Sequence, residues 1–249
     1  MSGAVAIFRR ELSGLFFQPL AWVLLFLALL FNGYLFTYYV QATEGDVTEA
    51  MLLSLGQALP FWGVLCVLAP LITMRMISEE SRNGVLEFLL TAPVTDAAVV
   101  AGKLLAATFF FAVLWSSVPL YGLVIDLLGT SPDWGQLLTA YAGSVLLSAF
   151  FCALGLFAST LTSTPALAAF LAFLLNIGFL LLPLLKRVLV GVVSEDLLEA
   201  AVAKVDVMTR FQSSFMVGAL DTGHLVFFLA WTGALLFATV RLLETRRWS

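Results

Sequence analysis

Ionisable side chains are concentrated in one short stretch of an otherwise apolar chain. Residues 73–103 read TMRMISEESRNGVLEFLLTAPVTDAAVVAGK and lie between two long apolar segments. The charged residues of this stretch are Arg75, Glu79, Glu80, Arg82, Glu87, Asp96 and Lys103. Because charges of both signs are concentrated here, a contact with water or with a protein partner is favoured over a plain membrane-surface anchor.

The residues typical of catalysis do not occur in catalytic combinations. His224 is the only histidine, and it begins the last apolar segment. Ser144 follows Gly143, but no second glycine follows at the expected place, and a serine nucleophile also needs a paired base. We therefore expect no enzymatic activity. Of the three functions that the sequence allows, an intramembrane enzyme is the least favoured.

Nucleotide and metal sites are not predicted either. Gly102 and Lys103 match the end of the phosphate-binding pattern GxxxxGK, but Leu104 stands where that pattern has Ser or Thr. Cys66 and Cys152 lie in apolar segments without metal-ligand spacing. We expect no cofactor and no metal in this chain.

Composition indicates that most of the chain is surrounded by lipid. Of its 249 residues, 61% are hydrophobic and only 11% are charged, whereas soluble domains have about 25% charged residues. The net charge of −4 argues against a nucleic-acid partner. Segments of roughly 20 apolar residues can cross a bilayer. We predict an all-α membrane protein, one domain over residues 1–249, with six transmembrane helices at 20–40, 53–74, 104–125, 137–160, 165–185 and 223–243.

Basic residues predict the orientation, because Lys and Arg near the ends of spans stay cytoplasmic. With the N-terminus inside, the inner side holds most of the bases, including Arg9, Arg10, Arg82 and Lys103. The predicted outer loops at 41–52 and 126–136 contain acids but no base. Both termini are therefore expected in the cytoplasm, and the charged stretch becomes the largest cytoplasmic loop.

Shorter amphipathic helices are expected around the spans. One is predicted at 78–92, where Ser78 could cap the helix and Pro93 limits it. An interface helix is predicted at 3–18, with a turn near Pro19, although a plain surface anchor remains the alternative there. Short helices are also expected in the external loop at 186–220.

The charged loop resembles a known family. RMISEESRNGVLEFLLTAPVTDAAVVAGKLLAA is similar to the cytoplasmic loop of permeases of the ABC type-2 transporter family. AIFRRELSGLFFQPLAWV, NGYLF, FQSSFMVGALD and VFFLAWTGALLFATVRLLETRRW resemble the subgroup of gliding-motility-associated permeases. Together the similar segments extend over nearly the whole chain.

The resemblance implies a permease subunit that is powered by a separate ATPase. In such transporters two permease chains, identical or related, pair in the bacterial inner membrane, and two ATPase subunits that bind ATP and Mg dock below them. The helix at 78–92 would be the coupling helix. By resemblance, the ATPase contacts would be Glu79, Glu80, Arg82, Glu87, Arg9 and Arg10. The translocation path would be lined by Phe61, Trp62 and Asn176.

Two functional hypotheses remain open beside the enzyme. The first is the permease of an ATP-driven transporter, with export as the expected direction. The second is a non-transporting membrane scaffold of a motility or secretion complex that uses an associated ATPase. A periplasmic accessory protein, the substrate and the identity of the second permease chain are left open by the sequence.

Overall fold

The computed structural model describes residues 3–85, 94–189 and 205–247. The secondary structure of these residues is helical, and 86% of them lie in helices. Six helical stretches of the described residues are long and apolar enough to cross a membrane. They are Pro19–Ala42, Val47–Arg82, Asp96–Leu127, Trp134–Leu161, Pro165–Pro183 and Thr222–Thr245. The predicted all-α membrane fold is thereby confirmed.

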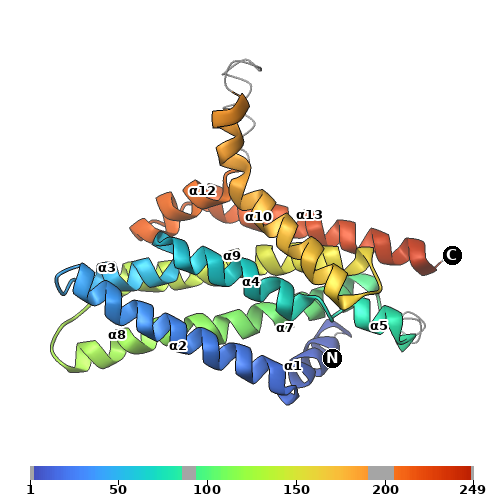
Figure 1. Ribbon diagram of the computed structural model, residues 1–249, viewed down its shortest axis with the longest axis horizontal. Helices are drawn as coiled ribbons and strands as arrows, with labels where there is room; N and C mark the ends of the chain where they lie inside the picture. Colours follow the sequence, from blue (N-terminus) through green and yellow to red (C-terminus); the bar gives the residue numbers. More distant parts are fainter. Residues whose placement is uncertain (1–2, 86–93, 190–204, 248–249) are drawn as a thin grey trace.

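Figure 1 shows the helical elements in chain order. They are α1 (Gly3–Phe17), α2 (Pro19–Ala42), α3 (Val47–Leu52), the π-helix η1 (Leu53–Gln57), α4 (Leu59–Thr73), α5 (Ser78–Arg82), α7 (Asp96–Trp115), α8 (Ser117–Leu127), α9 (Trp134–Leu161), α10 (Pro165–Leu189), α12 (Val207–Ser214), the 3-10 helix η2 (Phe215–Val217) and α13 (Thr222–Arg247).

Helix α9 is the central helix of the bundle and packs against α4, α7, α10 and α13. Small residues allow the neighbouring helices to approach it closely. At Gly155, a Cβ atom would overlap the side chain of Thr73 in α4. Close approach of this kind stabilises membrane helix pairs through van der Waals packing, because lipid supplies no hydrophobic driving force between helices.

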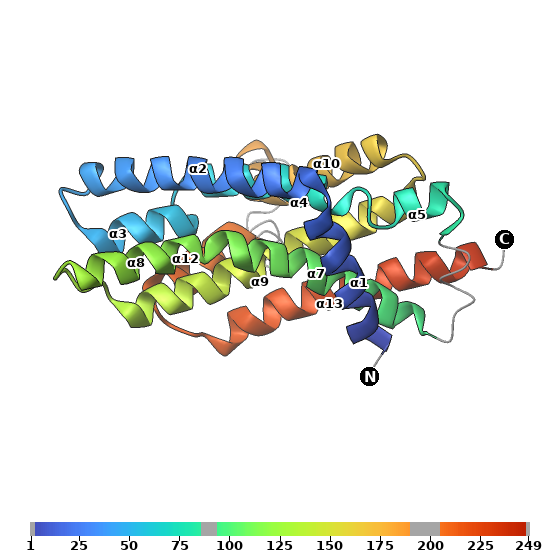
Figure 2. The same cartoon turned by 90° about the horizontal axis from the view of Figure 1, so that it is seen from below.

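Charged elements gather at one end of the bundle. In Figures 1 and 2, α1, α5, the start of α7 and both ends of the described chain lie at the same end, whereas α3 and the α8–α9 connection lie at the opposite end. Helix α1 crosses under α7 and joins α2 at Gln18, whose backbone is extended and precedes Pro19 (Figure 2). Proline disfavours a helical conformation in the preceding residue, so the chain turns there.

The second span is broken near the end that lies farther from α5. The π-helix η1 contains Gly56, with φ of 140°, and α4 restarts at Leu59 next to Pro60. This positive φ is strongly unfavourable for a side chain other than glycine. The second span, predicted at 53–74, is therefore divided into two segments, η1 and α4.

The helix predicted at 78–92 begins at Ser78 but does not run on unbroken. Helix α5 ends at Arg82, and Asn83 and Gly84 form a turn in which Gly84 has φ of 70°. Ser78 does not cap it as predicted: its hydroxyl donates to the Met74 carbonyl instead. Residues 86–93, which include Glu87, lie outside the described residues.

The external loop predicted at 186–220 is partly described. Helix α10 continues to Leu189, beyond the predicted end of the fifth span. Helix α12 and η2 occupy residues 207–217, so short helices do occur in this segment. Residues 190–204 lie outside the described part.

Candidate functional site

A glycine lets the N-terminal helix lie directly on the third span. A Cβ atom at Gly102 would come within 2.8 Å of the Ile7 side chain and 2.9 Å of the Ala4 carbonyl oxygen. Only glycine leaves room for this contact between α1 and α7. As a result, Lys103, the next residue, faces the polar side of α1.

Lys103 is the centre of an ion-pair network that joins three elements. Its side chain is fully buried, and its Nζ lies 3.1 Å from Glu11 Oε1 in α1 and 2.8 Å from Glu80 Oε2 in α5. It also donates a hydrogen bond of 2.7 Å to the Met76 carbonyl. Arg10 Nη2 completes the network, at 2.6 Å from Glu11 and 2.5 Å from Glu80.

The network is electrically balanced. Arg10 and Lys103 face Glu11 and Glu80. Removing a charge from water costs several kcal/mol, and this cost is offset only if every member keeps its partner. Burial alone lowers the pKa of Arg10, but the hydrogen bonds and charges of Glu11 and Glu80 together raise that pKa above its ordinary value. The four residues therefore stabilise one another as a unit.

The turn between α4 and α5 is fixed to the central helix as well. Ser159 of α9 accepts hydrogen bonds from the backbone N–H groups of Ile77, at 3.3 Å, and Ser78, at 3.0 Å. Its hydroxyl donates to the Met74 carbonyl at 3.1 Å. Helix α5 is thus attached to α1, α7 and α9.

A second group of charges remains at the surface. Arg75 Nε lies 3.8 Å from Glu79 Oε2, and their side chains are 48% and 36% exposed. With Met74 and exposed Arg82, they line a hollow of about 400 Å³ together with residues 164–166, where the connection from α9 ends and α10 begins. Sequence reasoning did not assign this connection to the site.

The structure divides the predicted ATPase contacts into two groups. Arg9 and Arg82 are exposed, and Glu79 is partly exposed. Glu80, with a side chain only 17% exposed, points into the ion-pair network, whereas Arg10 takes part in that network while its side chain stays 44% exposed. Glu87 lies outside the described residues.

Two members of the network, Glu11 and Lys103, were not among the predicted site residues. The sequence marks them only as charges close to apolar segments, and their pairing depends on the close approach at Gly102. In the sequence, the local signal for this pairing was a glycine directly before a lysine.

The residues predicted to line a path are buried within the chain. Phe61 and Trp62 are 3% and 1% exposed. The Trp62 indole donates to the Gly56 carbonyl at 2.9 Å, and the Phe61 ring lies against Trp115 with a centroid distance of 4.5 Å. They pack around the break in the second span.

Asn176 of α10 is fully buried, and neither polar atom of its side-chain amide has a hydrogen-bond partner among the described residues. Amide side chains inside membrane spans commonly link helices through hydrogen bonds. In this conformation the Asn176 amide does not do so within the part of the chain that the structure describes.

These features define a polytopic α-helical membrane protein with a mixed-charge cluster at one end of its bundle. A family model for ABC-2 family transporter proteins matches residues 5–247. The chain therefore belongs to the ABC-2 family of transporter proteins, as the sequence resemblance indicated. A comparison with curated proteins gave no match.

Proposed function

We propose that this chain is the permease subunit of an ATP-driven exporter, and that a separate ABC ATPase subunit docks on the end of the bundle that carries α5. Membership of the ABC-2 family supports a membrane transporter component. The sequence contains no complete phosphate-binding loop, so ATP and Mg would bind on the partner. The observation that carries the proposal is a short mixed-charge helix, α5, attached to three other helices.

The attachments of α5 are what a coupling element needs. A docked subunit that moves can change the conformation of a membrane bundle only if its contact surface is fixed to that bundle. Lys103 links α5 to α7, Glu11 links the same site to α1, and Ser159 links the adjoining turn to α9. Displacement of α5 would therefore move three helices together.

The docking surface in this proposal is the outward face of α5 with the hollow beside it. Arg82, Arg75 and Glu79 lie there together with residues 164–166. Arg9, exposed on α1, would form a flanking contact. Arg10 and Glu80 would act from behind, by holding α5 in place.

The remaining features of the proposal concern assembly and location. Two permease chains would pair in the bacterial inner membrane with both termini in the cytoplasm. Substrate would cross at the interface between them, and the aromatic residues around Gly56 and the buried amide of Asn176 would become accessible when the bundle opens.

Affinity purification of the full chain in mild detergent tests the proposal. We expect a subunit with a complete nucleotide-binding loop in an equal amount, with ATP hydrolysis that the permease stimulates. Arg82→Glu should lower its recovery, because the exposed charge is reversed at the contact. Glu49→Arg is the matched control, since Glu49 is exposed on α3 at the opposite end of the bundle.

The same preparation separates the proposal from the scaffold hypothesis. ATP-dependent movement of a substrate into inverted vesicles supports the transporter, whereas a stable ATPase complex without any such movement supports a scaffold. If no ATPase subunit is recovered with the wild-type chain, both are wrong.

A further inference from the structure

We propose that the seam between α1, α2, α4 and α5 is a binding site for one bilayer lipid with a zwitterionic, amine-bearing phosphate headgroup. The site consists of a polar cavity and an apolar groove that continue into each other. The site depends on the proposed function in one respect only, which is that the α5 end of the bundle lies at the inner leaflet.

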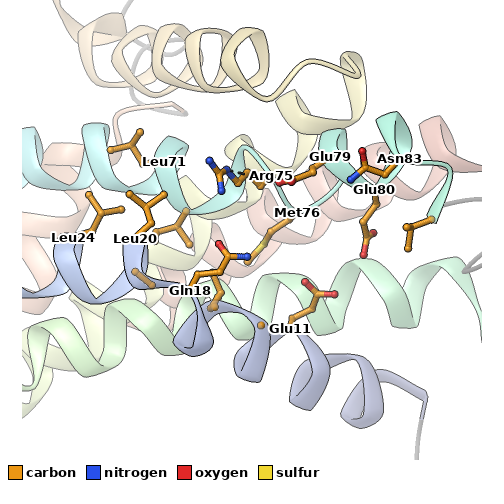
Figure 3. A pocket seen from close by; sticks show the side chains of 15 residues that line it. Glu11, Gln18, Leu20, Leu24, Leu71, Arg75, Met76, Glu79, Glu80 and Asn83 are labelled. Carbon is orange, nitrogen blue, oxygen red and sulfur yellow. Dashed lines mark ion pairs between the residues drawn. The ribbon is translucent and has the colours of Figure 1, made fainter.

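The cavity has one polar side and one apolar side. It encloses about 230 Å³ and is lined by residues of all four helices. In Figure 3, Leu20, Leu24 and Leu71 lie at one side of it, whereas Glu11, Glu79, Glu80 and Asn83 lie at the other. Such a gradient suits an amphiphile rather than a wholly polar or wholly apolar ligand.

An apolar groove extends from the apolar side of this cavity. It has a volume of about 590 Å³ and runs between α2 and α4. Leu24 and Leu71 line both the cavity and the groove. The other residues that line the groove are Leu27, Ala28, Phe31, Pro60, Gly63, Val64, Val67 and Leu68. An acyl chain can lie in the groove while its headgroup occupies the cavity.

The charges of the cavity sum to zero. Its lining includes the three acids Glu11, Glu79 and Glu80 and the base Arg75. Two further bases, Arg10 and Lys103, do not line the cavity but form ion pairs with two of these acids. Three acids thus face three bases. A ligand with one phosphate and one ammonium adds no net charge, whereas an anionic headgroup would leave one negative charge without compensation.

In the chain without a docked ATPase subunit, Arg75 and Glu79 are the groups that remain available to a ligand. They form only a loose pair at 3.8 Å, while Glu11 and Glu80 are held by Arg10 and Lys103. Leu71, Arg75 and Glu79 follow one another from the apolar to the polar side in Figure 3. This is the order of acyl chain, phosphate and ammonium in a phosphatidylethanolamine. A guanidinium binds phosphate well, and a carboxylate accepts hydrogen bonds from a primary ammonium.

A second apolar groove provides an internal control. It lies on α10, has a volume of about 430 Å³, and is lined by Leu174, Leu175, Gly178, Phe179, Leu181 and Leu182 without any charged residue. Lipid that merely surrounds the protein should occupy this groove as readily as the groove between α2 and α4. Only the seam should distinguish one headgroup from another.

Photolabelling of the purified full chain tests the site. The probe is phosphatidylethanolamine with a diazirine at the end of one acyl chain, in nanodiscs of phosphatidylcholine. We expect labelled peptides from residues 19–42 and 59–73. Unlabelled phosphatidylethanolamine should compete about tenfold more strongly than phosphatidylglycerol, because the two headgroups differ by one or two charge-assisted hydrogen bonds to the site.

Two glycine positions have open space for a first side-chain atom. A Cβ atom at Gly63, in the seam, and one at Gly178, in the control groove, each meet nothing within 4 Å. Gly63→Leu should fill the groove and lower labelling of residues 59–73 about tenfold, whereas Gly178→Leu should leave it unchanged. Glu79→Gln should abolish the preference for ethanolamine over glycerol, and Glu49→Gln, at the far end, should preserve it.

Three results would overturn the proposal. They are equal competition by the two lipids, labelling of residues 165–183 as strong as that of the seam, and normal labelling of the Gly63→Leu variant. No ATPase subunit is needed for binding, so the lipid site can fail while the docking experiment succeeds, or the reverse.

Discussion

At the scale of the residue, Lys103 shows how a membrane protein can hold a buried charge. Its ammonium has two carboxylates and one carbonyl as partners, all within 3.1 Å. Because these partners come from α1, α5 and the turn before α5, one side chain determines how three segments are arranged. From the sequence alone, a lysine at the end of an apolar segment is interpreted as an ordinary interfacial lysine.

Lys103→Met should be strongly destabilising. It leaves Glu11 and Glu80 with Arg10 alone, in a site where their side chains are only 13% and 17% exposed. Breaking a buried ion pair by removing one partner costs about 3–5 kcal/mol. A large fall in the thermal denaturation midpoint of the protein in detergent is expected.

The control for this change is Arg241→Met. Arg241 also forms an ion pair, with Glu244 at 2.7 Å, but its side chain is 63% exposed. Exposed pairs contribute little to stability. Equal midpoints for the two variants would show that the network around Lys103 is not a stabilising unit.

At the scale of the element, the position of α1 depends on the absence of a side chain in α7. Gly102→Ala places a methyl group within 2.8 Å of Ile7 and 2.9 Å of the Ala4 carbonyl, so α1 must shift and Glu11 must move away from Lys103. We expect faster amide hydrogen exchange in residues 3–17, which hydrogen exchange mass spectrometry measures.

Gly14→Ala is the matched change on α1 itself. A Cβ atom there meets nothing within 4 Å, and alanine favours a helix over glycine by about 1 kcal/mol. Exchange in α1 should slow down or stay unchanged in this variant. If both alanine variants behave alike, the close approach at Gly102 does not position α1.

The elements also show how far the sequence alone could lead. Apolar length predicted the six spans because each must cover the same hydrocarbon thickness, and the helix α1 followed from its amphipathic pattern. The break at Gly56 and the end of α5 at Asn83 depend on single backbone conformations. The ion pairs of Lys103 connect residues 23 to 92 positions apart. Only the tertiary packing determines such contacts, so the sequence could identify the charged stretch but not which of its residues point inward.

At the scale of the whole molecule, the fold separates two chemically different ends. The end with α5 carries the ion-pair network and the exposed arginines Arg9 and Arg82. The opposite end carries the acids of α3 and of the connection before α9, with Asp46 and Asp133 as helix caps. Because basic residues near span ends stay on the cytoplasmic side, this asymmetry predicts that the α5 end is cytoplasmic.

Cysteine accessibility tests the orientation that this asymmetry predicts. Both native cysteines are buried, so single substitutions at exposed positions can be labelled against a low background. Arg82→Cys should react with a membrane-impermeant maleimide in inverted vesicles and not in intact cells, whereas Glu49→Cys should show the reverse. Reaction of Arg82→Cys from outside would place α5 beyond the reach of any cytoplasmic ATPase. The exposed face of α5 and the hollow beside it would then have to serve an extracellular partner, and the permease proposal would lose its docking surface.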